Sequence, residues 1–264
     1  MHDVIEVTDR DDPRLDDYRA LSTADRRPDR PGGKGLVIAE GAIAVGRMLT
    51  SRYPIRSLLG VPRRLADLPL ADLDAPVYAA TPELMADVIG FHLNRGVLAV
   101  ADRPEPLSVS SVISGARTLA VLEGVGDHEN LGALFRNAAA FGVDGVLLGT
   151  GCSDPLYRRS VRVSMGHVLA VPFTGLSPWP EGLKLLQDNG FQVLALSPAG
   201  AVPLSSVEFG PRVAVLLGSE GPGLTPEALA AADHAVAIPM TGGVDSLNVA
   251  TAGAVAFYAL GAGR

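Results

Sequence analysis

Two stretches near the C-terminus decide the fold: GSEGPGL at residues 218–224 and IPMTGGVDSLNVATAGAVAFY at residues 238–258. Each begins where a short apolar run ends, and glycines and prolines then turn the chain ahead of a segment with helical spacing. In open α/β sheets, the loops that follow the carboxyl ends of strands are the usual place for a bound ligand. The two stretches therefore predict an α/β sheet with a ligand-binding rim near the end of the chain.

The alternation of strands and helices extends upstream from these loops. From about residue 118, segments of mostly helical spacing separate six short apolar runs: TLAVLEGV, VDGVLLG, HVLAVPF, FQVLALS, RVAVLLG and HAVAIPM. This alternation favours a mostly parallel sheet that is covered on both faces. We expect residues 117–264 to form one such domain, which ends in a helix of small residues at about 246–260.

A smaller α/β unit precedes this domain. Strands are predicted for LVIAE, IRSLLGV, VYAAT and GVLAVAD, and helices for GAIAVGRMLTSRY and TPELMADVIG, the latter with Thr81 as N-cap and Pro82 next. We assign this unit to residues 19–103, after an acidic leader at residues 1–18. The stretch DRPEPLSVSS, rich in proline and serine, indicates a linker at residues 104–116.

Composition narrows the class of protein. Of the 264 residues, 47% are hydrophobic and 19% are charged, as in a folded globular protein, and the one cysteine, Cys152, excludes an internal disulfide. The N-terminus lacks the apolar run of a secretory signal, and no uncharged apolar stretch is long enough to span a membrane. These features predict a cytoplasmic protein with no membrane partner.

The net charge of −7 is unevenly distributed. Residues 19–64 contain three acidic residues and ten basic ones: Arg19, Arg26, Arg27, Arg30, Lys34, Arg47, Arg52, Arg56, Arg63 and Arg64. Because the planar guanidinium group suits phosphate, this segment could supply the sequence-independent part of an affinity for nucleic acid. A set of solvated arginines is the alternative interpretation.

A third motif lies upstream, where a predicted strand leads into EGVGDHENLGALFRNAAAFG at residues 123–142. Asn130 is placed as the N-cap of a helix and Gly142 as the residue that ends it, while Arg136 lies off the apolar stripe. A dinucleotide-binding fingerprint is rejected because Glu129 stands where its third glycine would be. Taken alone, the motif also fits a simple cap with a solvated arginine.

The two C-terminal loops carry polar residues that either serve the backbone or face a ligand. Three glycines, the first of them Gly218, let backbone amides approach a ligand, and the carboxylate of Glu220 could orient a hydroxyl or a cation. Ser246 or Asn248 stands at the start of the last helix, where either could cap it. A glycine-rich turn and a capped helix are the alternatives.

Together these motifs resemble the SpoU/TrmH family of RNA 2′-O-ribose methyltransferases, within the SPOUT superfamily. Asn130-Leu-Gly with Arg136 is similar to the family's first motif, LGSEGPG at residues 217–223 to its second, and IPM through SLNV at residues 238–249 to its third. VSMG at residues 163–166 is similar to an additional family segment. The N-terminal unit is similar to the ribosomal-protein-like substrate-binding domain of many members.

The resemblance implies a deep trefoil knot in the C-terminal domain and a homodimer with its active site near the subunit interface. It also implies S-adenosylmethionine as the cofactor, held by the loops of the knot, and no metal. The residues expected to contact the cofactor or lie near it are Gly218, Ile238, Met240, Leu247 and Ala250, with Glu220 close by.

The catalytic set implied by the resemblance consists of Asn130, Arg136, Glu220, Ser246 and Asn248. Arg136 matches the residue proposed to act on the ribose hydroxyl, but a guanidinium, whose pKa is above about 12, is a poor base. We therefore expect Arg136 to bind the adjacent phosphate while the other four orient the ribose and the loops. This chain has His128 at a position where the family commonly has proline, but Asn130 and Arg136 of the same motif are present.

The predicted function is methyl transfer from S-adenosylmethionine to a ribose 2′-hydroxyl of RNA. Ribosomal RNA is favoured over transfer RNA, because tRNA-modifying relatives often lack an N-terminal domain of this kind. The alternatives are a tRNA 2′-O-methyltransferase and a catalytically silent RNA-binding protein of the same fold. Methylation of a base is a further alternative, but the Ser-Leu-Asn motif favours the ribose.

Overall fold

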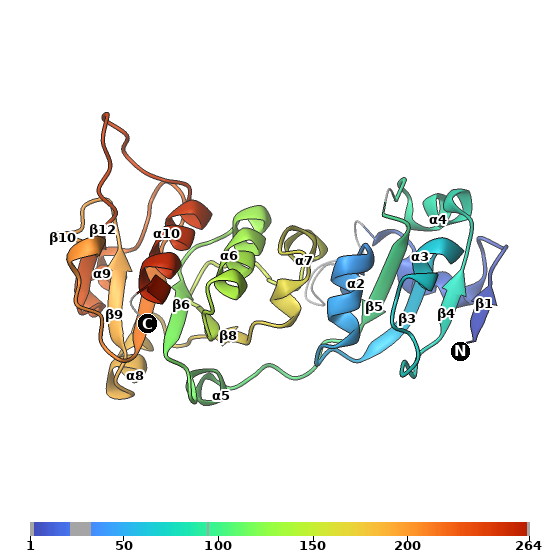
Figure 1. Cartoon of the computed structure of the whole chain (residues 1–264), viewed down its shortest axis with the longest axis horizontal. Coiled ribbons are helices and arrows are strands. Elements are labelled where there is room, and N and C mark those ends of the chain that lie inside the picture. Colours follow the sequence, from blue (N-terminus) through green and yellow to red (C-terminus); the bar gives the residue numbers. More distant parts are fainter. Residues whose placement is uncertain (1–2, 22–32, 94, 263–264) are drawn as a thin grey trace. The chain divides into compact units, whose positions relative to one another are not determined.

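The computed structural model describes residues 3–21, 33–93 and 95–262 and divides into two compact units (Figure 1). The first unit comprises Met1–Glu105 with Asp154–Ala170, and the second comprises Pro106–Ser153 with Val171–Arg264. Arg26, Arg27 and Arg30 of the basic segment lie outside the described residues.

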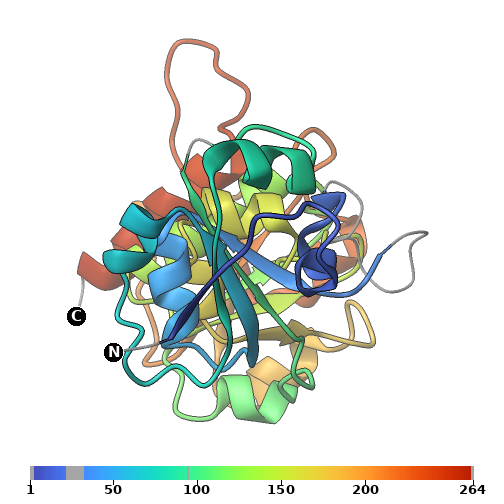
Figure 2. The ribbon, with the colours of Figure 1, turned by 90° about the vertical axis from the view of Figure 1, so that its right-hand side faces the viewer.

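The first unit is built on a five-stranded sheet in the order β1-β4-β3-β5-β2, which Figure 2 shows from the front. β4 pairs in parallel with β1 and β3, and β5 pairs antiparallel with β3 and β2. The strands are β1 (Val4–Glu6), β2 (Val37–Glu40), β3 (Ile55–Gly60), β4 (Val77–Ala79) and β5 (Val97–Ala101). The helical segments are η1 (Pro13–Tyr18), α2 (Ala42–Leu49), α3 (Pro62–Ala66), α4 (Pro82–Ile89), α7 (Arg158–Val163) and η2 (His167–Leu169).

The acidic N-terminus is part of this unit, so its prediction as a separate leader is wrong. β1 extends the sheet, and Leu15 and Tyr18 of η1 are fully buried in the core. The Tyr18 hydroxyl lies 2.7 Å from the Ser57 hydroxyl in a buried hydrogen bond. The acidic residues dominate the composition of this segment, but the few apolar residues between them determine where it packs.

The second unit is built on a seven-stranded sheet in the order β10-β12-β9-β11-β6-β7-β8, and every neighbouring pair is parallel. The strands are β6 (Thr118–Leu122), β7 (Gly145–Leu148), β8 (Phe173–Gly175), β9 (Gln192–Leu196), β10 (Val202–Pro203), β11 (Val213–Leu217) and β12 (His234–Ala237). The helical segments are α5 (Val109–Ile113), α6 (His128–Ala140), α8 (Leu183–Asp188), η3 (Leu204–Ser206), α9 (Pro226–Ala231) and α10 (Val249–Ala262). The predicted mostly parallel α/β sheet is confirmed.

The strand order brings the two glycine-rich loops to the same edge of the sheet, on either side of the chain that follows β9. β6, β7 and β8 follow one another toward one edge of the sheet. The next strand in the chain, β9, lies on the opposite side of β6, where β11 separates it from β6. Such a reversal of strand order creates a crevice at the carboxyl ends of the strands. The loops after β11 and β12 both begin there, and the loop after β12 extends far from the sheet before α10 (Figure 1).

Two local predictions differ from the structure. The run HVLAVPF was predicted as a strand, but residues 167–169 form η2 in the first unit, and β8 begins only at Phe173. The predicted linker is shorter than expected, because α5 buries Val112 and Ile113 in the core of the second unit. Among the residues that the structure describes, no helix is long and apolar enough to cross a bilayer.

Candidate active site

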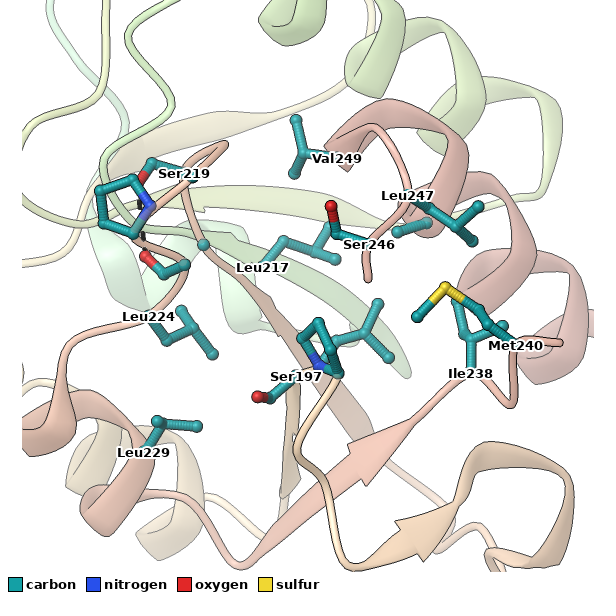
Figure 3. A pocket seen from close by; sticks show the side chains of 17 residues that line it. Ser197, Leu217, Ser219, Leu224, Leu229, Ile238, Met240, Ser246, Leu247 and Val249 are labelled. Atoms are coloured by element: carbon teal, nitrogen blue, oxygen red, sulfur yellow. Dashed lines mark hydrogen bonds between the residues drawn. The ribbon is translucent and has the colours of Figure 1, made fainter. Parts of the chain in front are cut away.

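A pocket of about 240 Å³ lies at the carboxyl ends of β9, β11 and β12 (Figure 3). Its walls come from five segments: the end of β9, the loop after β11, α9, the chain that follows β12, and the start of α10. Among the residues that the structure describes, no residue that lines the pocket carries a charged side chain. The pocket can therefore hold a ligand only through apolar contact and backbone groups, with a few serine hydroxyls.

The loop after β11 turns back tightly on itself. The Gly223 backbone N donates to the Ser219 carbonyl at 3.1 Å, and Gly221 and Gly223 have positive φ angles of 83° and 73°. A Cβ at Gly218 would lie 2.3 Å from the Gly223 carbonyl carbon, so a side chain there has no space. The Thr225 hydroxyl then accepts from the Ala228 backbone N at 3.2 Å and begins α9.

Asn248 joins three parts of the chain beside this pocket. Its Nδ2 donates to Asn130 Oδ1 at 2.7 Å and to Glu220 Oε1 at 2.6 Å. Its Oδ1 accepts from the backbone N of Ala250 at 3.0 Å and of Thr251 at 3.1 Å, which makes Asn248 the cap of α10. The amide cluster of Asn130, Glu220 and Asn248 therefore unites one predicted catalytic residue from each of the three motifs.

Asn130 can take part in this cluster because it does not cap its own helix, contrary to the prediction. Asp127 is the N-cap of α6, and its Oδ1 accepts from the backbone N of Glu129 and of Asn130, both at 2.9 Å. His128 takes the first helical position, where a proline would also fit. Gly142, with a φ of 69°, follows the last turn as predicted.

Arg136 lies apart from the amide cluster. It follows Asn130 by six residues on α6, which turns its side chain by about 240° around the helix axis. The side chain is exposed, and it forms no hydrogen bond or ion pair with the rest of the described chain. Within a single chain, the Arg136 side chain therefore does not join the cluster of Asn130, Glu220 and Asn248.

Most of the other predicted residues surround the pocket. Gly218, Ile238, Met240, Ser246 and Leu247 all line it. Ala250 is not one of the described lining residues: it is buried, and its carbonyl accepts from Asn137 Nδ2 at 2.8 Å, which ties α10 to α6.

Sequence reasoning missed Glu123, which is buried directly after β6 and contacts Thr225 at the end of the glycine-rich loop. The sequence feature that could have identified Glu123 is an acidic residue directly after a strand that is buried along its whole length. Cys152 lies nearby, with Sγ 3.2 Å from the Leu122 carbonyl oxygen, and burial raises the pKa of its thiol. A raised pKa makes this cysteine a poor nucleophile.

The chain resembles known proteins over most of its length. The model of the SpoU rRNA Methylase family matches residues 117–258. An uncharacterized tRNA/rRNA methyltransferase of Mycobacterium tuberculosis is 58% identical over 97% of this chain and 91% of its own length. Among solved structures, the AdoMet-bound rRNA methyltransferase from Sinorhizobium meliloti is 26% identical, with a TM-score of 0.79 and 97% of each chain covered. The structure of an RNA 2′-O ribose methyltransferase is 25% identical, with a TM-score of 0.78 and the same coverage.

Proposed function

The chain belongs to the SpoU rRNA methylase family, and from that premise we propose that it transfers a methyl group from S-adenosylmethionine to a ribose 2′-hydroxyl of RNA. The observation that carries the proposal is the amide cluster of Asn130, Glu220 and Asn248 beside an uncharged pocket. The likeness to an RNA 2′-O ribose methyltransferase supports the ribose as the target.

The pocket fits S-adenosylmethionine in its chemistry. When bound, this cofactor supplies a methyl group activated by a positively charged sulfur. No Lys or Arg of the described chain lines the pocket to repel that charge, and Leu217, Ile238 and Leu247 offer apolar surface for a flat base. Gly218, Ile238, Met240 and Leu247 would hold the cofactor, and Ala250 would support this wall from behind.

The amide cluster is suited to orient a ribose. Both hydrogens of the Asn248 amide are used within the cluster, so its orientation is fixed. Among the described residues, the Asn130 Nδ2 and the Glu220 Oε2 keep no protein partner, which leaves a donor group and an acceptor atom for sugar hydroxyls. Ser246 at the pocket wall adds a hydroxyl, and holding the nucleophile in place can supply much of the rate.

We propose that Arg136 binds the phosphate next to the target ribose. Replacing Arg136 by lysine should lower kcat/KM for RNA about tenfold without changing the affinity for S-adenosylmethionine, because one bidentate contact is lost. Arg136→Met, which removes the charge, should cause a larger loss. Steady-state rates with tritiated cofactor would measure both, and full activity of the lysine variant would rule out a bidentate role.

A homodimer would bring Arg136 of one subunit to the amide cluster of the other. An apolar surface of α10 and the end of α6 supports this arrangement, because Phe141, directly after α6, is 38% exposed, and Val255 and Tyr258 of α10 are 39% and 63% exposed. The rings of Phe141 and Tyr258 lie 6.0 Å apart in an edge-to-face contact. An exposed apolar face of this kind is typical of an interaction site.

Tyr258→Glu should therefore shift the protein from dimer to monomer, since it places a charge in the proposed interface. Sedimentation velocity would measure the shift. Leu185→Glu is the matched control, because Leu185 is also exposed, at 43%, but lies on α8. A wild-type chain that sediments as a monomer would contradict the dimer.

We further propose that the first unit recognises ribosomal RNA. Ribosomal RNA as the substrate, recognised by the first unit, is supported by the full-length likeness to an rRNA methyltransferase. Within the basic segment, Arg56 pairs with Asp17 and Asp102. Arg63 and Arg64 are exposed on α3, with Arg64 4.0 Å from Asp67, and their guanidinium groups could meet phosphates. We also propose a trefoil knot in the second unit, with which the position of β11 between β6 and β9 is compatible, and a cytoplasmic location.

The direct test uses tritiated S-adenosylmethionine and total RNA from a strain that lacks the gene for this chain. We expect label in ribosomal RNA, and specifically in dinucleotides that survive alkali, because a 2′-O-methyl group blocks alkaline cleavage. Label in the tRNA fraction would favour the tRNA alternative, and label in mononucleotides would favour a base. A protein that neither binds the cofactor in calorimetry nor labels RNA would be the catalytically silent alternative.

A further inference from the structure

Glu123 is a buried carboxylate outside the proposed catalytic set, and only 3% of it is exposed. Its Oε1 accepts hydrogen bonds from Trp179 Nε1 at 2.6 Å and from Thr225 Oγ1 at 2.8 Å. Its Oε2 accepts from the backbone N of Thr225 at 2.9 Å. Three donors on one carboxylate offset the penalty of burying its charge.

These contacts require both oxygens of Glu123 to accept. The indole nitrogen of Trp179 and the backbone N of Thr225 can only donate. The Thr225 hydroxyl already accepts from the Ala228 backbone N as the cap of α9, so its hydrogen is directed to Glu123. A glutamine at this position has one accepting oxygen, and its amide group would meet a donor.

The position of Thr225 connects these contacts to the pocket. Thr225 directly follows the loop at residues 218–224, which lines the pocket and carries Glu220 of the amide cluster. The loop starts from β11 in the middle of the sheet, and residues 220–222 are exposed. The sheet fixes its first end, and Glu123, directly after the neighbouring β6, fixes its second end.

We propose that Glu123 is a positioning residue: its carboxylate holds the glycine-rich loop against the end of β6, so that the pocket wall is in place before the cofactor arrives. A pre-formed wall avoids the entropic cost of ordering the loop on binding. The identity of the ligand rests on the proposed function, whereas the anchoring of the loop does not.

The test uses Glu123→Gln in the full chain. Calorimetry should show S-adenosylmethionine binding weakened by about 10- to 100-fold, as expected for lost hydrogen bonds to a buried charge. At saturating cofactor and RNA, kcat should stay within about twofold of wild type, because the loop adopts the same position once the cofactor is bound. Trp179 is the one tryptophan, so loss of the carboxylate charge 2.6 Å from its indole nitrogen should change the emission of the cofactor-free variant.

Three further variants separate positioning from a general loss of stability. Thr225→Val should weaken cofactor binding but keep the emission of wild type, since the Trp179 contact remains. Thr225→Ser, which keeps the hydroxyl, should restore binding. Glu40→Gln is the matched control, because Glu40 is a buried acid of the first unit, 3.3 Å from Arg158, and it should leave cofactor affinity unchanged.

Wild-type affinity in Glu123→Gln and Thr225→Val would overturn the proposal, and so would equal weakening by Glu40→Gln. If the wild-type chain does not bind S-adenosylmethionine at all, the proposed function fails. Hydrogen exchange of the loop amides at residues 218–224 in the cofactor-free proteins then decides on the anchor alone: faster exchange in Glu123→Gln and Thr225→Val than in wild type supports it, and unchanged exchange refutes it.

Discussion

Replacing Asn248 by alanine should lower kcat/KM for methyl transfer by at least about 100-fold, the largest loss that we expect from one side chain. The substitution removes hydrogen bonds to Asn130 and to the Glu220 carboxylate, and a bond to a charged group contributes about 1.5–3 kcal/mol. It also removes the cap of α10, which should lower the free energy of unfolding by about 1 kcal/mol.

Asn248→Asp separates these two effects. A carboxylate can still accept from the amides at the start of α10, where the helix dipole favours a negative charge. It cannot donate to Asn130, and it repels Glu220. We therefore expect the aspartate variant to be more stable than the alanine variant and equally inactive, as measured by denaturant unfolding and methyl transfer.

Thr81→Ala provides the matched control for stability. Thr81 Oγ1 accepts from the Leu84 backbone N at 3.2 Å and caps α4 in the first unit, as the sequence predicted. Its loss should cost about 1 kcal/mol of stability. If Thr81→Ala reduces methyl transfer as much as Asn248→Ala does, the role proposed for the amide cluster is wrong.

Gly218→Ala should weaken S-adenosylmethionine binding by at least about 100-fold, measured by calorimetry. The added methyl would lie 2.3 Å from the Gly223 carbonyl carbon and 2.4 Å from the Leu224 N, and backbone atoms cannot move aside as a flexible side chain can. Relieving such a clash typically costs about 1–3 kcal/mol, and here it displaces the loop that forms the pocket wall.

Gly46→Ala is the corresponding control. Gly46 lies within α2, and nothing stands within 4 Å of a Cβ added there, so alanine should leave cofactor binding unchanged and stabilise the helix. Tight cofactor binding by Gly218→Ala would mean that the ligand does not use this loop.

The sequence by itself determined the local structure of the ligand-binding unit. Periodicity and turn residues identified β6, β11 and β12, and the caps at Thr81 and Gly142 lie where the pattern placed them. These signals are local, because strand alternation, helix caps and positive φ angles depend on residues a few positions apart. The three motifs and their order were sufficient to indicate the family.

Tertiary structure decided which polar groups meet. Asn248 and Asn130 are 118 residues apart, and Glu123 and Thr225 are 102 apart, so no local pattern could reveal that they are hydrogen-bonded. Asn130 looked like a cap because asparagine favours that position, but the helix begins earlier, where Asp127 accepts from the amides of Glu129 and Asn130. The acidic N-terminus belongs to the first unit because Leu15 and Tyr18 find a core there. Residues 154–170 belong to it because α7 packs against β2 and η2 against α2. Helices and turns follow from residues that are neighbours in the chain. The pocket loops near the C-terminus acquire their polar partners differently. They do so only when the order of the parallel strands brings distant segments to one edge of the sheet.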